Sequence, residues 1–157
     1  MKNKVIEYAG YTLHVLTFIA YFVLLFILDS SQALGFLSYF GFLFFGLGIL
    51  FVVLSITSQR RNKNGKLIES SVYGIVRHPM YLGGMLLFIA MTLFLPHWIM
   101  LLLSLINVVI IYCFTVAEEK VDIATFGEAY QQYMRRVPRI NPVIGLYKSL
   151  KRKKKII

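Results

Sequence analysis

Long stretches of apolar residues alternate with short polar segments along this 157-residue chain. Four such stretches contain no Lys or Arg: residues 11–28, 33–56, 79–95 and 98–117. At about 1.5 Å per residue, helices of these lengths reach about 25–36 Å, and the hydrocarbon core of a bilayer is about 30 Å thick. The pattern therefore predicts four membrane-spanning helices.

The composition supports this interpretation. Hydrophobic residues make up 58% of the chain and its mean hydropathy is +0.70, whereas soluble domains are about 45–50% apolar. Cys113 is the single cysteine, which excludes an internal disulfide. We expect an all-α polytopic membrane protein that forms a single integral membrane domain over residues 1–157.

The basic residues predict how the spans are oriented. Two of the 17 Lys and Arg residues precede the first apolar stretch, five lie between the second and third, and ten follow the fourth. The connections at residues 29–32 and 96–97 contain none. By the positive-inside rule, both termini and the loop at residues 57–78 are cytoplasmic. Because this topology accounts for the net charge of +10, we expect no nucleic-acid partner.

The connections also predict how the helices pair. The two connections without basic residues are very short, so the first two and the last two spans should form antiparallel hairpins. Beyond the fourth span, an amphipathic helix that ends at Pro138 is expected. A basic tail covers residues 143–157, and within it Lys148–Lys155 should be a solvated strip attracted to anionic lipid. The residues that recur at helical spacing in this amphipathic segment are Phe126, Tyr130, Tyr133 and Met134.

Polar residues cluster at the cytoplasmic start of the third apolar stretch. Pro79 suits the first turn of a helix, whose free N–H groups and positive dipole end attract anions. Arg77 and His78 precede it, so this corner is a candidate anion-binding site. Alternatively, Arg77 anchors to lipid headgroups and His78 caps the helix. Tyr73 and Tyr81 flank the corner, where they either enclose a ligand or belong to the aromatic belt of the membrane interface.

Glu118 and Glu119 follow the fourth stretch, on the same side of the membrane. Acidic residues at the C-terminal end of a helix oppose its dipole, so these carboxylates need partners. Arg77, Arg135 and Arg136 are candidate structural partners, and hydroxyl groups of a bound ligand are candidate functional ones. No group of His, Cys, Asp and Glu residues has the spacing of a metal site, so no metal is expected.

These residues belong to a longer pattern that resembles a family of membrane methyltransferases, which includes isoprenylcysteine carboxyl methyltransferase and phospholipid N-methyltransferase. The pattern covers residues 65–142, about half of the chain, and keeps the order and spacing of the family. Ser71 is a departure, because the family usually has glycine at this position. The residues that carry the resemblance are Tyr73, the run from Val76 to Gly83, Glu118, Glu119, the run from Phe126 to Tyr130, Tyr133, and the run from Arg136 to Arg139.

The resemblance implies that S-adenosylmethionine is the methyl donor and S-adenosylhomocysteine the product, bound on the cytoplasmic side. It implies catalytic roles for Arg77 and Glu119 and makes residues 57–142 the cofactor-binding core. The two N-terminal spans, within residues 1–56, would then shape the substrate side. The donor-binding residues that it implies are Tyr73, Val76, Arg77, His78, Pro79, Tyr81, Gly83, Glu118, Glu119, Tyr130 and Arg136.

The acceptor is expected to be lipidic and to enter sideways from the bilayer. The carboxylate of an isoprenylated cysteine is favoured, because it is already ionised and the sequence shows no dedicated base. A phospholipid amine or a thiol is the alternative acceptor. Two other classes stay open. One is an NADPH-dependent membrane reductase of similar C-terminal architecture. The other is a small four-span transporter, which is disfavoured because none of the seven acidic residues lies mid-span.

Overall fold

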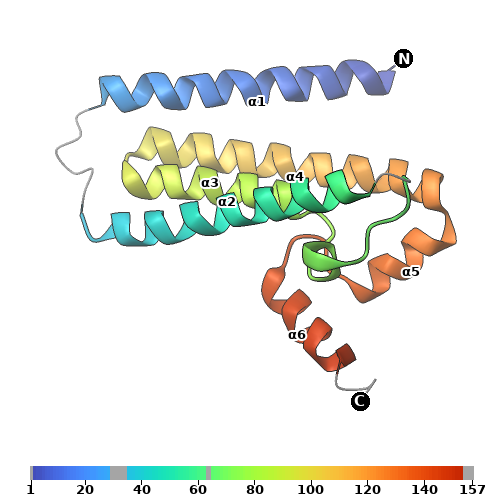
Figure 1. Cartoon of the computed structure of the whole chain (residues 1–157). Coiled ribbons are helices and arrows are strands. Elements are labelled where there is room, and N and C mark those ends of the chain that lie inside the picture. Colours follow the sequence, from blue (N-terminus) through green and yellow to red (C-terminus); the bar gives the residue numbers. More distant parts are fainter. Residues whose placement is uncertain (1, 29–34, 63–64, 154–157) are drawn as a thin grey trace. The chain divides into compact units, whose positions relative to one another are not determined.

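A computed structural model of the chain describes residues 2–28, 35–62 and 65–153. Every regular element in these ranges is a helix, so the predicted all-α class is confirmed. The α-helices, labelled in Figure 1, are α1 (Lys2–Ile27), α2 (Leu37–Arg61), α3 (Pro79–Phe94), α4 (Trp98–Phe126), α5 (Glu128–Arg136) and α6 (Pro142–Lys153). A short 3₁₀ helix, η2 (Ser71–Gly74), precedes α3.

Two of these helices, α2 and α4, are long and apolar enough to cross a membrane by length and composition. The segment Val15–Leu24 of α1 and the whole of α3 are apolar but shorter. The prediction of four spans therefore stays a prediction, with two of the four expected segments supported by this criterion. The predicted connection at residues 29–32 lies outside the described residues.

The helices extend beyond the apolar stretches that predict them. The expectation that the fourth helix ends at residue 117 is wrong, because α4 continues to Phe126. Residues 118–126 contain no Gly or Pro, and the helix ends only before Gly127, which adopts a φ of 58° that other residues rarely take. Glu118 and Glu119 therefore lie inside a helix, away from its C-terminal end, so the helix dipole is not the reason why they need partners.

The basic tail at residues 143–157 contains a helix that the apolar pattern did not predict. The chain forms most of α6 there, and Lys148 and Lys151 are exposed. Asn141 caps this helix, because its side-chain oxygen accepts a hydrogen bond from the Ile144 N–H at 3.0 Å. Pro142 occupies the first helical position, where its missing N–H costs nothing. This start signal is present in the sequence and predicts a helix.

The chain divides into two compact units, each of which contains parts of α2, α3 and α4. The first unit comprises Met1–Gly46 and Met85–Tyr112. It buries polar side chains and exposes large apolar ones, such as Phe26 and Phe36. The Tyr21 hydroxyl donates to the Met100 carbonyl at 2.7 Å, and Thr17 donates to Asn107 at 2.8 Å. An apolar exterior around satisfied polar groups is the arrangement that a lipid environment requires.

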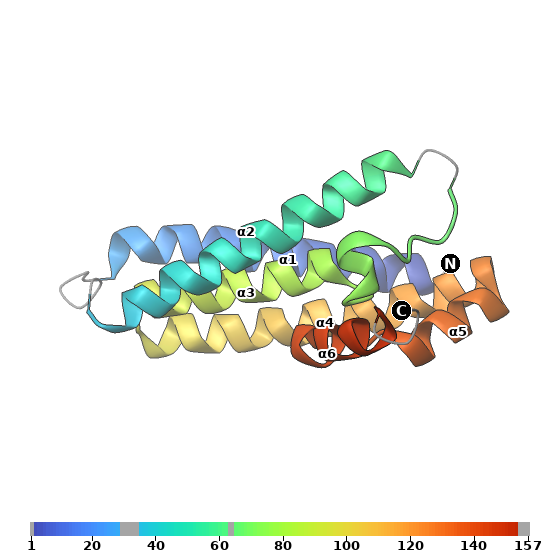
Figure 2. The same cartoon turned by 60° about the horizontal axis from the view of Figure 1, so that its bottom comes forward.

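The second unit comprises Leu47–Gly84 and Cys113–Ile157. Figure 2 shows the chain leave α2, pass through η2 and return to the start of α3. Two backbone hydrogen bonds tie that start to the segment after α5: the Arg77 N–H donates to the Pro138 carbonyl at 3.0 Å, and the His78 N–H donates to the Arg139 carbonyl at 3.1 Å. These bonds bring residues that are far apart in the sequence to one place.

Close packing of α2 on α3 in the second unit depends on Gly83. A Cβ at this position would lie 2.7 Å from the Gly48 carbonyl oxygen and 2.7 Å from Val52 Cγ2. In contrast, a Cβ at Gly46 would meet nothing within 4 Å. An added methyl group would therefore clash with α2 at Gly83, whereas it would meet no neighbouring atom at Gly46.

We predict that Gly83→Ala lowers the free energy of unfolding by about 1–3 kcal/mol, because the backbone of α2 cannot move aside for the methyl group. Gly46→Ala is the matched control and should leave stability unchanged or raise it by up to about 1 kcal/mol, since alanine favours a helix. Thermal unfolding of both variants in one detergent measures the difference. Equal melting temperatures would contradict this packing.

Candidate functional site

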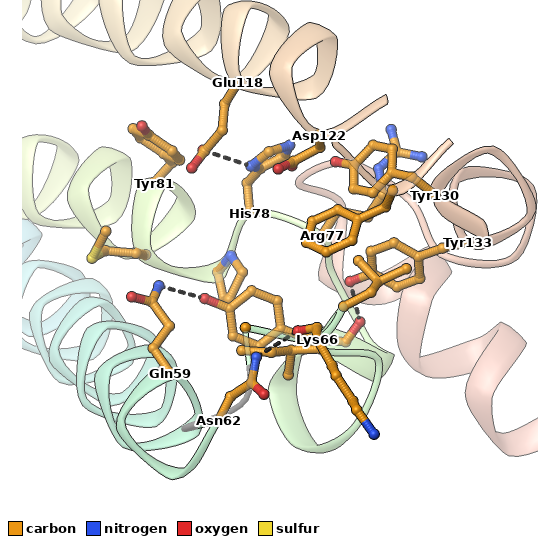
Figure 3. Close-up of a pocket in the computed structure, with 17 residues that line it drawn as sticks. Gln59, Asn62, Lys66, Arg77, His78, Tyr81, Glu118, Asp122, Tyr130 and Tyr133 are labelled. Carbon is orange, nitrogen blue, oxygen red and sulfur yellow. Dashed lines mark hydrogen bonds and ion pairs between the residues drawn. The ribbon is translucent and has the colours of Figure 1, made fainter. Parts of the chain in front are cut away.

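A cavity of about 310 Å³ opens in the second unit. Its wall is formed by the end of α2, the segment before η2, the start of α3, the end of α4 and α5, as Figure 3 shows. Small-molecule sites typically measure about 300–1,000 Å³. Of the residues predicted to bind the donor, those that line this cavity are Tyr73, Arg77, His78, Pro79, Tyr81, Glu118 and Tyr130.

Arg77 is buried in the wall and is held by three acceptors. Its Nη1 donates to the Met134 carbonyl at 2.9 Å and to the Val137 carbonyl at 3.2 Å, and its Nη2 donates to Glu119 Oε1 at 2.6 Å. The Nε of Arg77 is buried without a hydrogen-bond partner. A planar guanidinium with five donors suits this position, because it bonds several acceptors at once in a fixed geometry.

Glu119 is buried between two arginines. Besides Arg77, it accepts hydrogen bonds from Arg139, whose Nε lies 3.0 Å from Oε1 and whose Nη2 lies 2.5 Å from Oε2. Such charge-assisted bonds are short and strong, and they allow the carboxylate to stay ionised although it is buried. The Glu119 side chain does not line the cavity. Its geometry instead holds Arg77 in place, and its predicted catalytic role stays a prediction.

His78 connects the two glutamates. Its Nδ1 lies 3.3 Å from Glu118 Oε2, and its Nε2 lies 3.4 Å from Glu119 Oε1 without hydrogen-bond geometry. The His78 side chain is only 4% exposed, whereas that of Glu118 is 47% exposed and lines the cavity. Figure 3 shows Glu118, His78 and Tyr81 together on one side of the cavity. Glu118 is therefore the glutamate that is accessible to a ligand.

Aromatic side chains form the opposite side. Tyr130 and Tyr133 of α5 are buried together, and the Tyr133 hydroxyl donates to the Tyr73 carbonyl at 2.7 Å. Burial raises the pKa of both phenols, and the neighbouring Asp122 carboxylate raises the pKa of Tyr130 further. Both hydroxyls therefore stay protonated at physiological pH. Gln59 Nε2 donates to the Tyr73 hydroxyl at 2.7 Å and so fixes that ring from α2.

The remaining predicted site residues lie outside the cavity wall. Val76 is fully buried beneath it, and Gly83 packs against α2. Arg136 forms an exposed ion pair with Glu69 at 2.6 Å. As described above, Glu119 lies behind Arg77. The structure thus separates a cavity wall from a supporting layer, a distinction that spacing along the sequence does not reveal.

Sequence reasoning missed several residues of the wall. Asp122 lies one helical turn after Glu118, so continuing the helix beyond residue 117 would have placed it on the same face. Gln59, Asn62 and Lys66 come from the end of α2 and the following loop. No local signal in the sequence indicates these three, because only the folded chain brings them to α3 and α5.

The fold and the site define a helical protein with long apolar helices and a polar cavity built around an Arg-His-Pro turn. The profile of the phospholipid methyltransferase family matches residues 36–129, more than half of the chain. The chain therefore belongs to this family of methyltransferases, and the resemblance noted in the sequence is confirmed. The matched range includes α3, the whole of α4 and most of the cavity wall.

A curated relative agrees with this membership. The chain is 31% identical to the Protein-S-isoprenylcysteine O-methyltransferase of Schizosaccharomyces pombe over 90 aligned residues. These aligned residues make up 57% of the chain. The match spans only 38% of the length of that relative. No solved structure matches the chain.

The two adjacent glutamates should respond differently to substitution. We predict that Glu119→Gln lowers the free energy of unfolding by about 3–5 kcal/mol, because it leaves Arg77 buried without its counter-charge. Glu118→Gln is the matched control and should change stability by no more than about 0.5 kcal/mol, since its side chain is partly exposed. Chemical denaturation in detergent measures both. Equal stability of the two variants would show that Glu119 does not hold the site together.

Proposed function

We propose that this chain is an integral membrane enzyme that transfers a methyl group from S-adenosylmethionine to a lipidic acceptor at the cytoplasmic face. The observation that carries the proposal is the cavity in which the Arg-His-Pro turn and Glu118 meet, in a chain of the phospholipid methyltransferase family. The favoured acceptor is the carboxylate of an isoprenylated cysteine.

The residues of the cavity suit the chemical groups of this donor. S-Adenosylmethionine carries a carboxylate, an ammonium group, a ribose diol, an adenine ring and a reactive sulfonium. Arg77 and His78 line the cavity at the N-terminal start of α3, where a positive charge and the helix dipole favour an anionic group. Glu118 and Asp122 supply acceptors for the ammonium or the ribose hydroxyls. Tyr73, Tyr81 and the other aromatic side chains supply faces for the adenine.

The donor supplies an activated methyl group, so the protein has to align and desolvate the reactants rather than activate them. Arg77 would act by binding an anionic group of a reactant, and Glu119 and Arg139 would act on Arg77 as positioning residues. Tyr130 and Tyr133 exclude water from the deep side of the cavity, because both rings are buried. Within this proposal, residues 57–142 form the donor-binding core.

Two arguments support a carboxylate as the acceptor: its ionisation state and the name of the relative. A carboxylate is already ionised near neutral pH and needs no base, whereas an amine must lose a proton before it attacks. The relative from Schizosaccharomyces pombe is named as an isoprenylcysteine O-methyltransferase, which supports the carboxylate over an amine or a thiol. A lipid-like acceptor would reach the cavity from the bilayer, past the two N-terminal spans within residues 1–56.

The membrane topology completes the proposal. We infer four spans that form two hairpins, with both termini and the cavity on the cytoplasmic side. All 17 basic residues fall on that side of the predicted topology. Two helices satisfy the length and hydropathy required of a span, and α3 is a shorter apolar helix between them. A cytoplasmic cavity gives a water-soluble donor direct access.

Purified protein in lipid vesicles, supplied with S-adenosylmethionine labelled on its methyl group, tests the acceptor. We predict that label is transferred to farnesylated N-acetylcysteine and that mild base releases it, as expected for a methyl ester. The matched control is the same compound with its carboxylate already esterified, which should accept no label. Transfer to phosphatidylethanolamine alone, or to a small soluble thiol alone, would contradict the proposed acceptor.

A further inference from the structure

A second hollow, of about 250 Å³, lies between α5 and α6 in the second unit and is lined by basic side chains alone. Its lining residues are Arg135, Arg136, Lys148, Lys151 and Arg152. Basic residues gathered in one place without acidic neighbours favour an anionic ligand. None of these residues lines the cavity described above.

Hydrogen bonds and close packing hold the helices around the hollow in place. Arg152 donates from Nη2 to the Gly74 carbonyl at 2.8 Å and from Nη1 to the Arg136 carbonyl at 3.1 Å, so it ties α6 to η2 and to the end of α5. A Cβ at Gly145 would lie 1.9 Å from the Ile75 carbonyl oxygen, which shows how closely α6 approaches the chain after η2. Arg136 is anchored by Glu69.

The other three basic residues carry most of the free positive charge. In the part of the chain that the structure describes, no ion pair reaches Arg135, Lys148 or Lys151, and all three side chains are exposed. The hollow is therefore lined by these three exposed cations and by two arginines, Arg136 and Arg152, that are held by other contacts. This arrangement complements a phosphate, which accepts several charge-assisted hydrogen bonds at once.

Apolar side chains on the same helix indicate where that phosphate comes from. Val143, Leu146, Tyr147 and Leu150 of α6 are all at least half exposed. These residues share one side of the helix at spacings of three and four, next to the lysines. A helix with an exposed apolar row and flanking lysines lies in the membrane interface, its apolar side among acyl chains. A soluble phosphate would leave that row exposed to water.

We propose that the hollow between α5 and α6 binds the phosphate of an anionic phospholipid, while the apolar row of α6 lies among the acyl chains of the same leaflet. The lipid phosphate offsets the charge of Arg135, Lys148 and Lys151, which no ion pair within the described residues neutralises. The site is separate from the methyl-donor cavity, so it does not depend on the function proposed above. It would fix the C-terminal helix to the membrane surface.

The test is competition between two lipids for the full-length protein in a neutral detergent. Phosphatidylglycerol and phosphatidylcholine with identical acyl chains are added in equal amounts, and native mass spectrometry counts the lipids that stay bound. Each basic residue near an anionic headgroup contributes about fivefold in affinity. We expect phosphatidylglycerol to be retained at least about tenfold over phosphatidylcholine. The readout is a ratio within one spectrum, so a change in the folded fraction does not alter it.

Three variants and one competitor make the test specific. The triple variant Arg135→Gln, Lys148→Gln, Lys151→Gln should reduce the preference to within about twofold. The control variant Arg60→Gln, Arg61→Gln, Lys120→Gln loses the same charge from exposed positions elsewhere and should keep the preference. The variant Leu146→Ser, Leu150→Ser should retain less of both lipids, and glycerol 3-phosphate should not displace phosphatidylglycerol.

Four results would overturn the proposal. The first is equal retention of both lipids by the wild-type protein, and the second is full preference in the triple variant of the hollow. The third is an equal loss of the phosphatidylglycerol preference in the control variant, which would mean that the net charge of the protein accounts for the preference. Displacement by glycerol 3-phosphate, with no effect of the two serine substitutions, would assign the hollow to a soluble phosphate instead.

Discussion

The buried carboxylate of Glu119 is the interaction on which the site depends. It accepts hydrogen bonds from Arg77, at the start of α3, and from Arg139, in the segment after α5. The same two segments are joined by the backbone bonds of Arg77 and His78. One carboxylate on α4 therefore ties α4 to the start of α3, which forms part of the cavity wall, and to the segment after α5 that lies behind it. Burying this charge costs several kcal/mol without partners, so α4 is stable in this position only when both arginines are in place.

Two adjacent glutamates have opposite environments because of helix geometry. Successive residues on a helix point about 100° apart. Glu119 consequently points into the protein and is neutralised by arginines, whereas Glu118 faces the cavity and is close to His78. The ion pair between Arg77 and Glu119 thus keeps Arg77 from pairing with Glu118. Glu118 stays available to a ligand, and the cavity presents separate acidic and basic groups to a donor that carries both charges.

The sequence was sufficient for the helical class, the cluster around Arg77 and His78, and the family. These depend on local patterns: long apolar stretches, a proline at a helix start, and an ordered motif. It was insufficient where the outcome depends on contacts between distant segments. Which glutamate is buried, and the contribution of Gln59 from α2, follow from packing that spacing does not encode. The length of α4 and the start of α6 were missed for a different reason. Both had local signals, the lack of a breaker before Gly127 and the Asn141-Pro142 cap.

Binding of S-adenosylhomocysteine, the demethylated form of the donor, to the cavity tests the central claim most directly. Isothermal titration of the detergent-solubilised full chain with S-adenosylhomocysteine should give one binding site, and titration with NADPH should give none. Glu118→Gln should weaken binding by roughly 10- to 150-fold, the value of one charge-assisted hydrogen bond of about 1.5–3 kcal/mol, without lowering the melting temperature. Glu128→Gln, an exposed glutamate of α5 outside the cavity wall, is the control and should bind normally. Binding of NADPH in place of S-adenosylhomocysteine, or unchanged affinity in Glu118→Gln, would contradict this account.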